Sequence, residues 1–238
     1  FGGALTAGIS YTTVPGLGGP GLQGIPSDLI ISDNVIEGFF DRTAFTGSAI
    51  KLRGDAAGNN PLRDVKVTGN TTRESGISSF DEMSEFLISG NTLDGHFPGN
   101  VNPGYGIQLA TNVDGKPNRG VVISNLLKRF GSGIVLLGTE ANGRPTDIRI
   151  SDNYLTQIVK TQDQRADTFV GIGSKAIGLD FCENIQISDN SVSTMGTALD
   201  NSDTPIPLVG NCWPIAVYCR NSSQIDMIGN SLSRIESM

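Results

Sequence analysis

The stretch Ile148-Arg149-Ile150-Ser151-Asp152-Asn153 is one copy of a motif that returns along the whole 238-residue chain. In this asparagine motif, two apolar residues flank a variable one, and a small polar residue, Asp or Gly, and Asn follow. The other copies end at Asn34, Asn70, Asn91, Asn190 and Asn230, and a degraded copy, Val121-Val122-Ile123-Ser124-Asn125, places its Asn one residue early. Such repetition predicts an architecture of stacked structural repeats.

A second motif, the isoleucine motif, lies between these copies. A small residue or Pro is followed by Ile, a variable residue and, in most copies, an apolar residue. Its copies start at Ala49, Gly76, Gly106, Gly133, Ala176 and Pro214, and Gly8-Ile9-Ser10-Tyr11 resembles them. Apolar residues alternate in both motifs, which predicts short strands with one buried face.

The spacing of the motifs predicts a β-solenoid. Successive Asn residues of the motif are 36, 21, 34, 28, 37 and 40 positions apart. A β-solenoid absorbs such variation in the turns of each coil, and an Asn at one fixed place per coil would stack into a hydrogen-bonded ladder. The alternative is that Asp-Asn and Gly-Asn are ordinary hairpin turns, but antiparallel partner strands would then have to flank each turn.

Over residues 25–238 these motifs resemble the parallel β-helix repeat of the pectate-lyase-like superfamily. The resemblance implies an all-β fold, a right-handed parallel β-helix of about seven coils. Residues 1–24 form a Gly-rich lead-in with the remnant of an earlier coil, and we expect the chain to be a fragment of a longer one. The superfamily includes polysaccharide lyases, glycoside hydrolases, uronan epimerases and bacteriophage tailspikes, and some members only bind or serve as structure.

The composition and charge of the chain argue against several classes of partner. A formal charge of −7 and a pI near 4.7 argue against a nucleic-acid partner, and no apolar run is long enough for membrane insertion. The three cysteines show no C-x-x-C pair and His96 is the single histidine, so we expect no metal and no cofactor. Cys182 and Cys219 align between successive coils, and we favour a stacked buried pair over a disulfide.

The outward positions of the isoleucine motif offer one candidate site. The catalytic signatures of the superfamily's named enzyme families are missing, so no residue role is carried over from them. Asp180 has Tyr218 and Arg220 on the next coil and Glu140 on the previous one, which gives the one cluster that combines acid, base and ring. Outward carboxylates on nearby coils would lie at the separations that glycoside hydrolases use. The alternative for each member is an ordinary surface residue.

The turns that precede the isoleucine motifs offer a second candidate site. Two long turns flank the short turn of the fourth coil, and they predict a groove with that coil as its floor. One wall would carry His96, Phe97 and Tyr105 for substrate binding, and the other Arg165 for binding with Asp163 and Asp167 as acid and base. The alternative is that the long turns are merely tolerated insertions.

Turns that end at Pro61, Pro117 and Pro145 place Lys116, Arg119 and Arg144 on neighbouring coils, where they could form a small basic edge.

We expect the outward side chains of Phe80, Val135 and Leu137 to form an exposed apolar stripe. The stripe would serve either a homotrimer contact or sugar stacking.

By resemblance the leading expectation is an extracellular enzyme that binds and cleaves a polysaccharide, either as a hydrolase or as a lyase, of the tailspike-like or secreted depolymerase kind. The rival expectation is a non-catalytic glycan-binding or structural segment of a shaft or adhesin. The absence of any enzyme-family signature favours the rival.

Overall fold

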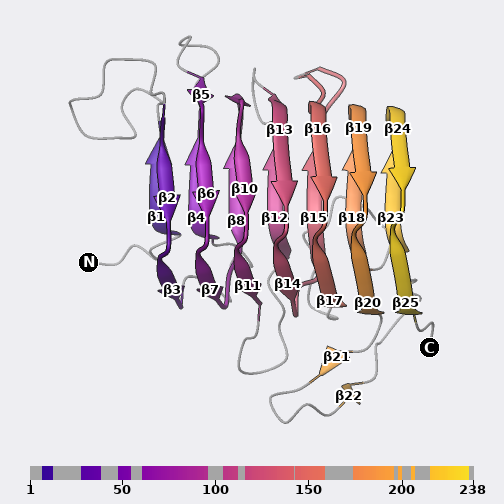
Figure 1. The fold of residues 1–238 in the computed structure, drawn as a ribbon. Coiled ribbons are helices and arrows are strands. Elements are labelled where there is room, and N and C mark those ends of the chain that lie inside the picture. Colours follow the sequence, from indigo (N-terminus) through magenta and orange to yellow (C-terminus); the bar gives the residue numbers. More distant parts are fainter. Residues whose placement is uncertain are drawn as a thin grey trace.

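The computed structural model describes residues 7–12, 28–38, 48–54, 61–95, 104–111, 116–141, 143–158, 174–195, 198–199, 205–206 and 215–235. Within these ranges the chain contains strands and turns but no helix. Figure 1 shows the strands side by side in chain order from the N-terminal to the C-terminal end of a solenoid.

Three parallel sheets form the sides of the solenoid. Sheet 1 contains β1 (Ala7–Thr12), β4 (Ser48–Arg53), β8 (Ile77–Phe80), β12 (Tyr105–Ala110), β15 (Ser132–Leu137), β18 (Lys175–Asp180) and β23 (Ile215–Arg220). Sheet 2 contains β2 (Ile30–Ser32), β6 (Lys66–Thr68), β10 (Leu87–Ser89), β13 (Pro117–Ile123), β16 (Thr146–Ser151), β19 (Glu183–Ser188) and β24 (Ser223–Ile228), with β5 (Leu62–Arg63) and β9 (Met83–Ser84) beside them. Sheet 3 contains β3 (Val35–Glu37), β7 (Thr71–Arg73), β11 (Thr92–Asp94), β14 (Leu126–Lys128), β17 (Tyr154–Ile158), β20 (Ser191–Met195) and β25 (Ser231–Ile235).

The chain passes through sheets 1, 2 and 3 in turn and then returns to sheet 1 beside its previous strand. Crossover connections between parallel strands of one sheet are right-handed in nearly all proteins. The fold is therefore the predicted right-handed parallel β-helix of about seven coils. The antiparallel alternative is wrong for the repeat, since the antiparallel pairings in the described ranges are β21 (Ala198–Leu199) with β22 (Pro205–Ile206) and an isolated bridge.

The core follows from the register of these strands. The Ile of the isoleucine motif stacks on the Ile of the next coil from Ile9 to Ile177, as Ile107 does between Ile77 and Ile134. The last copy was predicted in the wrong register, because Ile177 pairs with Val217 and not with Ile215. The second apolar residue of each asparagine motif stacks in the same way in sheet 2, and Leu93, Leu127, Leu155 and Val192 form a column in sheet 3. These columns are fully buried in the middle coils.

The asparagine ladder forms as predicted and runs without a gap through Asn34, Asn70, Asn91, Asn125, Asn153, Asn190 and Asn230. The residue before each Asn has a positive φ, between 55° and 68°. Gly occupies this left-handed position three times, and Asp or Ser the other times. Glycine has no Cβ to hinder that conformation, and Asp tolerates it. This bend turns the chain from sheet 2 into sheet 3.

The prediction that Asn125 stands one residue early in the degraded copy was wrong. Leu87 pairs with Val121 and Thr92 with Leu126, so Asn125 stands directly beside Asn91 and is not one residue early. Gly120 therefore occupies the place of the motif's first apolar residue. A Cβ added at Gly120 would lie 2.0 Å from Cζ of Phe86 on the previous coil. The Phe86 ring fills the space that the missing side chain leaves.

Two further expectations were wrong in part. Val135 of the predicted exposed apolar stripe is fully buried, while Phe80 and Leu137 are half-buried. The predicted stacked cysteine pair is also out of register, because Cys219 pairs with Leu179 while Cys182 stands beside Ser222. Cys182 is buried, Cys219 is exposed, and neither is in a disulfide.

Candidate functional site

The cluster predicted on sheet 1 is in part an ion pair. Asp180 ends β18 and Arg220 ends β23 in register with it. The guanidinium donates to the carboxylate of Asp180 at 2.9 Å from Nε and 2.5 Å from Nη2, and the Asp180 side chain is buried. Tyr218 projects from the neighbouring outward position of β23 and is half-buried. Glu140 lies exposed in the turn after β15 and has no hydrogen bond or ion pair with any described residue.

Most of the residues predicted to form the walls of the groove over the fourth coil lie outside the described residues. His96, Phe97, Asp163, Arg165 and Asp167 all lie there. Tyr105 is described, and it begins β12 in register with Ser132 of the next coil. The groove over the fourth coil therefore stays a prediction.

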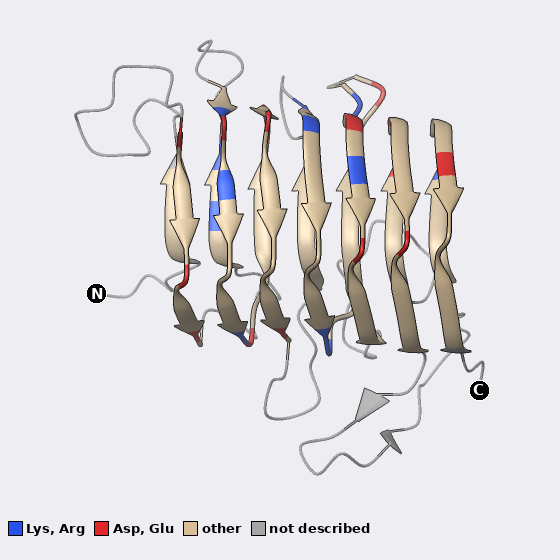
Figure 2. Cartoon of the chain, viewed as in Figure 1, with Lys and Arg blue, Asp and Glu red and all other residues tan. Residues whose placement is uncertain are grey.

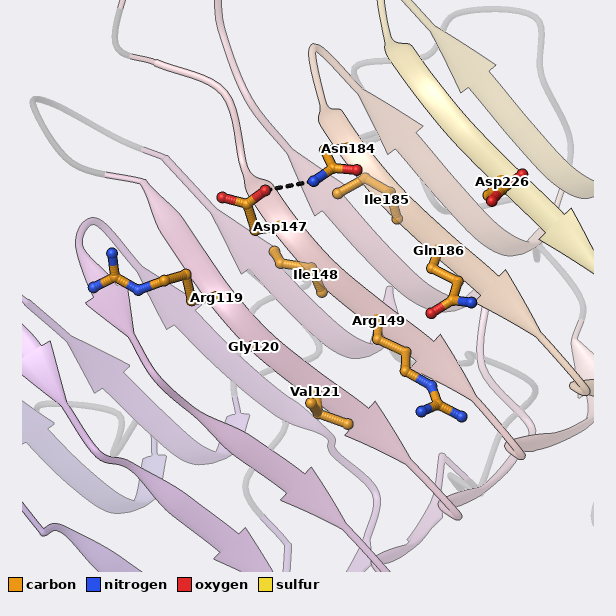
Figure 3. A pocket seen from close by; sticks show the side chains of 10 residues that line it. All are labelled: Arg119, Gly120, Val121, Asp147, Ile148, Arg149, Asn184, Ile185, Gln186 and Asp226. Atoms are coloured by element: carbon orange, nitrogen blue, oxygen red, sulfur yellow. Dashed lines mark hydrogen bonds between the residues drawn. The ribbon is translucent and has the colours of Figure 1, made fainter.

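The structure contains a different groove, on the outer face of sheet 2 (Figure 3). It is open to solvent, has a volume of about 520 Å³ and crosses β13, β16, β19 and β24. Gly120, Val121, Ile148 and Ile185 contribute backbone and apolar atoms to its surface. Its polar side chains are those of Arg119, Asp147, Arg149, Asn184, Gln186 and Asp226.

These side chains form two columns along the solenoid axis. Arg119, Asp147 and Asn184 occupy the residue before the first inward position of sheet 2, and each has a left-handed backbone, with φ of 48°, 56° and 51°. Two residues later Arg149, Gln186 and Asp226 pair in register on three successive strands. Neighbouring strands lie about 4.8 Å apart, so each column presents one polar side chain per coil at that spacing.

Some of these groups already have partners within the protein. Arg119 forms an ion pair of 3.3 Å with Glu85 of the previous coil, and the side-chain amide of Asn184 donates to Asp147 at 2.6 Å. The side chains of Arg149, Gln186 and Asp226 are exposed and have no hydrogen-bond or ion-pair partner among the residues that the structure describes. This second column is free to bind a ligand.

Comparison with family models, with curated proteins and with solved structures found no match. The groove on sheet 2 is therefore the feature from which a function can be inferred.

Figure 2 shows basic and acidic residues scattered over the described strands and turns of the solenoid. Of the predicted basic edge, Arg119 forms an ion pair with Glu85, and the guanidinium of Arg144 lies 6.0 Å from the ring centre of Phe181.

The described residues contain no group of three or more His, Cys, Asp or Glu side chains placed to hold a metal ion. No helix in those ranges has the length and hydropathy that a bilayer crossing requires.

Sequence reasoning missed this groove because it looked for chemistry in the isoleucine motif and in the long turns. The signal lay at the variable position inside the asparagine motif. That position holds Ile30, Lys66, Leu87 and Val121 in the first four coils, and Arg149, Gln186 and Asp226 in the last three. The run of three polar residues marks three of the four coils that line the groove.

Proposed function

We propose that this chain is a member of the pectate-lyase-like superfamily that binds a polysaccharide along the outer face of sheet 2. The observation that supports the proposal is the open groove across four coils, with planar hydrogen-bonding side chains repeated on successive strands. Arg, Asn, Gln and Asp each present two hydrogen-bonding atoms in one plane. Such groups suit neighbouring hydroxyls of a sugar.

The shape of the groove favours a polymer over a small molecule. Pockets for small ligands are concave, mostly apolar and bury most of the ligand. This groove is open along its length and is lined by six polar side chains. Because its two columns repeat with the coil, the matching ligand is an extended chain that also repeats.

Cleavage is a second candidate function, since Asp147 and Asp226 line the same groove. Their strands are separated by one intervening strand, which places the two backbones about 10 Å apart in that direction. Inverting glycosidases hold their carboxyl groups about 6.5–9.5 Å apart. Both carboxylates are exposed, however, and a catalytic acid is held in a desolvated pocket. The groove therefore favours binding over hydrolysis.

We also propose that the protein is extracellular and that it forms a homotrimer.

A matched pair of glutamines tests the binding proposal. Gln186 faces outward from sheet 2 inside the groove, whereas Gln108 faces outward from sheet 1. In affinity electrophoresis against a panel of plant and bacterial polysaccharides, we expect at least one polymer to retard the protein. Gln186→Ala should weaken that binding about tenfold through lost hydrogen bonds, and Gln108→Ala should leave it unchanged. Equal effects of the two substitutions, or no retardation by any polymer, would overturn the proposal.

The same panel separates binding from cleavage. New reducing ends would indicate hydrolysis and unsaturated uronates would indicate a lyase. If Asp147 and Asp226 act as an acid–base pair, either Asn substitution should abolish product formation while the protein still binds. We expect binding without product.

A further inference from the structure

The groove has as many cationic as anionic side chains, with two arginines and two aspartates. Arg119 is neutralised by Glu85, and Asp147 accepts a hydrogen bond from Asn184. Arg149 and Asp226 remain, and neither has a hydrogen bond or ion pair with a described residue. A ligand in the groove therefore meets one positive charge without an ion pair, that of Arg149, and two negative ones, because the neutral amide of Asn184 leaves the charge of Asp147 in place beside that of Asp226.

The charges of Arg149 and Asp226 stand in a single column with an amide between them. Arg149 pairs in register with Gln186, and Gln186 with Asp226, on three successive strands (Figure 3). Arg149 offers hydrogen-bond donors only, the ionised Asp226 offers acceptors only, and Gln186 offers both. The partner must accept at one end of the column and donate at the other.

Among the common groups of a glycan, the hydroxyl meets both demands, because it donates and accepts. A carboxylate or sulfate accepts only, and would face Asp226 two coils from the arginine it binds. An ammonium donates only, and would face Arg149. The protein's own charge of −7 adds a further unfavourable term for a polyanion.

We therefore infer that the groove takes an uncharged polysaccharide, which lies along the solenoid axis with its hydroxyls on Arg149, Gln186 and Asp226. The inference rests on the proposed function and specifies its substrate class. Arg149 acts as a hydrogen-bond donor to hydroxyls and not as the counter-ion of an acidic sugar.

The test compares uncharged, acidic and basic polymers on the same protein. The uncharged set is a β-glucan, a mannan and a galactan; the acidic set is polygalacturonate, alginate and hyaluronate; and chitosan is the basic polymer. We expect retardation by an uncharged polymer, with affinity changing less than about twofold between 0.01 and 1 M NaCl. Over that range the Debye length falls from about 30 Å to about 3 Å, which would abolish binding that depends on charge.

Substitutions at Arg149 give a second readout. Arg149→Gln keeps a hydrogen-bond donor and removes the charge, so it should weaken binding of the uncharged polymer no more than about threefold, against about tenfold for Arg149→Ala. For a polyanion ligand, the two substitutions would weaken binding equally. Because Arg149 is exposed, both variants should unfold at the wild-type temperature.

The outcomes separate the two levels of the proposal. Binding confined to acidic polymers or to chitosan, with loss at high salt, overturns the uncharged substrate class but leaves a glycan groove. Absence of binding to every polymer overturns both. Salt-independent binding of an uncharged polymer that Gln186→Ala and Gln108→Ala weaken equally overturns the site.

Discussion

At the scale of single residues, each ladder asparagine from Asn70 to Asn190 joins three coils. Asn91 donates to Oδ1 of Asn125 from its backbone N–H at 3.0 Å and from its side-chain amide at 2.9 Å. Asn125 repeats both bonds toward Asn153 and also donates back to the carbonyl of Ile88. The ladder therefore has a direction, because each Asn donates toward the C-terminal end. Asn230 is the last member and has no acceptor beyond it among the described residues.

This direction predicts unequal costs for the same substitution. Asn125→Ala leaves buried donors of Asn91 without an acceptor, so the free energy of unfolding should fall by about 2–4 kcal/mol. Asn34→Ala removes the half-buried first member, to whose Oδ1 no described asparagine donates, and should cost less than about 1 kcal/mol. Urea denaturation of both variants measures the difference, and equal losses would contradict the ladder's role.

The thiol of Cys182 predicts a pH dependence. Burial, the largest cause, raises the pKa of the thiol from 9.0 to about 12. The unfolded thiol ionises above pH 9 while the folded one stays neutral, so its contribution to stability is complete below pH 9 and is lost as the pH rises toward 12. Other groups titrate in the same range, and Cys182→Ser is the control that isolates this one. The difference in unfolding free energy between wild type and Cys182→Ser should shift against wild type from pH 9 to 12, whereas a constant difference would refute the assignment.

At the scale of secondary-structure elements, β10 and β13 show how neighbouring coils compensate for each other. The aromatic ring of Phe86, which precedes β10, occupies the space above Gly120 of β13. Ion pairs join other neighbours in a similar way, as Arg53 does with Asp81 and Arg129 with Asp94. Side chains of neighbouring coils are therefore complementary in size or charge, although the coils differ in length.

The Phe86–Gly120 pair gives a prediction in which two substitutions compensate. Gly120→Ala places a methyl group against the ring and should destabilise the protein by about 1–3 kcal/mol through overpacking. Phe86→Leu opens space at the same point, so the double variant should recover part of that loss. A thermodynamic cycle over the two single variants and the double variant measures the coupling. Additive effects would mean that the ring does not hinder the new methyl group.

At the scale of the whole molecule, the two ends of the solenoid differ. The core residues Ile31 and Ile36 of the first coil are 6% and 7% exposed. Their counterparts in the last coil, Met227 and Leu232, are 55% and 52% exposed. Because repeat proteins gain stability from contacts between neighbouring repeats, the last described coil should open most readily.

Two leucines in the same column test this gradient. Leu155 is fully buried in β17, and Leu232 stands two strands away in β25 at the open end. Leu155→Ala should cost about 2–5 kcal/mol, as buried leucines do. Leu232→Ala should cost less than about 1 kcal/mol, because about half of its surface is already in water. Thermal unfolding followed by circular dichroism compares the two, and similar losses would mean that this end is covered in solution.

The sequence by itself determined the strands, the three-sided coil and the asparagine ladder. Alternation of apolar residues and a repeated Asn are local signals, because each strand needs one inward face and each turn needs its polar group satisfied. The register of the degraded copy was not a local signal. Asn125 takes its place because the Phe86 ring fills the gap at Gly120 on the neighbouring coil, which only packing decides.

The candidate site depended on the tertiary structure for the same reason. Outward side chains follow no pattern that the backbone imposes, so their chemistry depends on which strands become neighbours. Stacking placed Arg149, Gln186 and Asp226 in one column, paired Asp180 with Arg220 and buried Val135. The inward residues follow from the hydrophobic effect acting on each strand, whereas the outward constellation exists only after turns of different length have set the register of the coils.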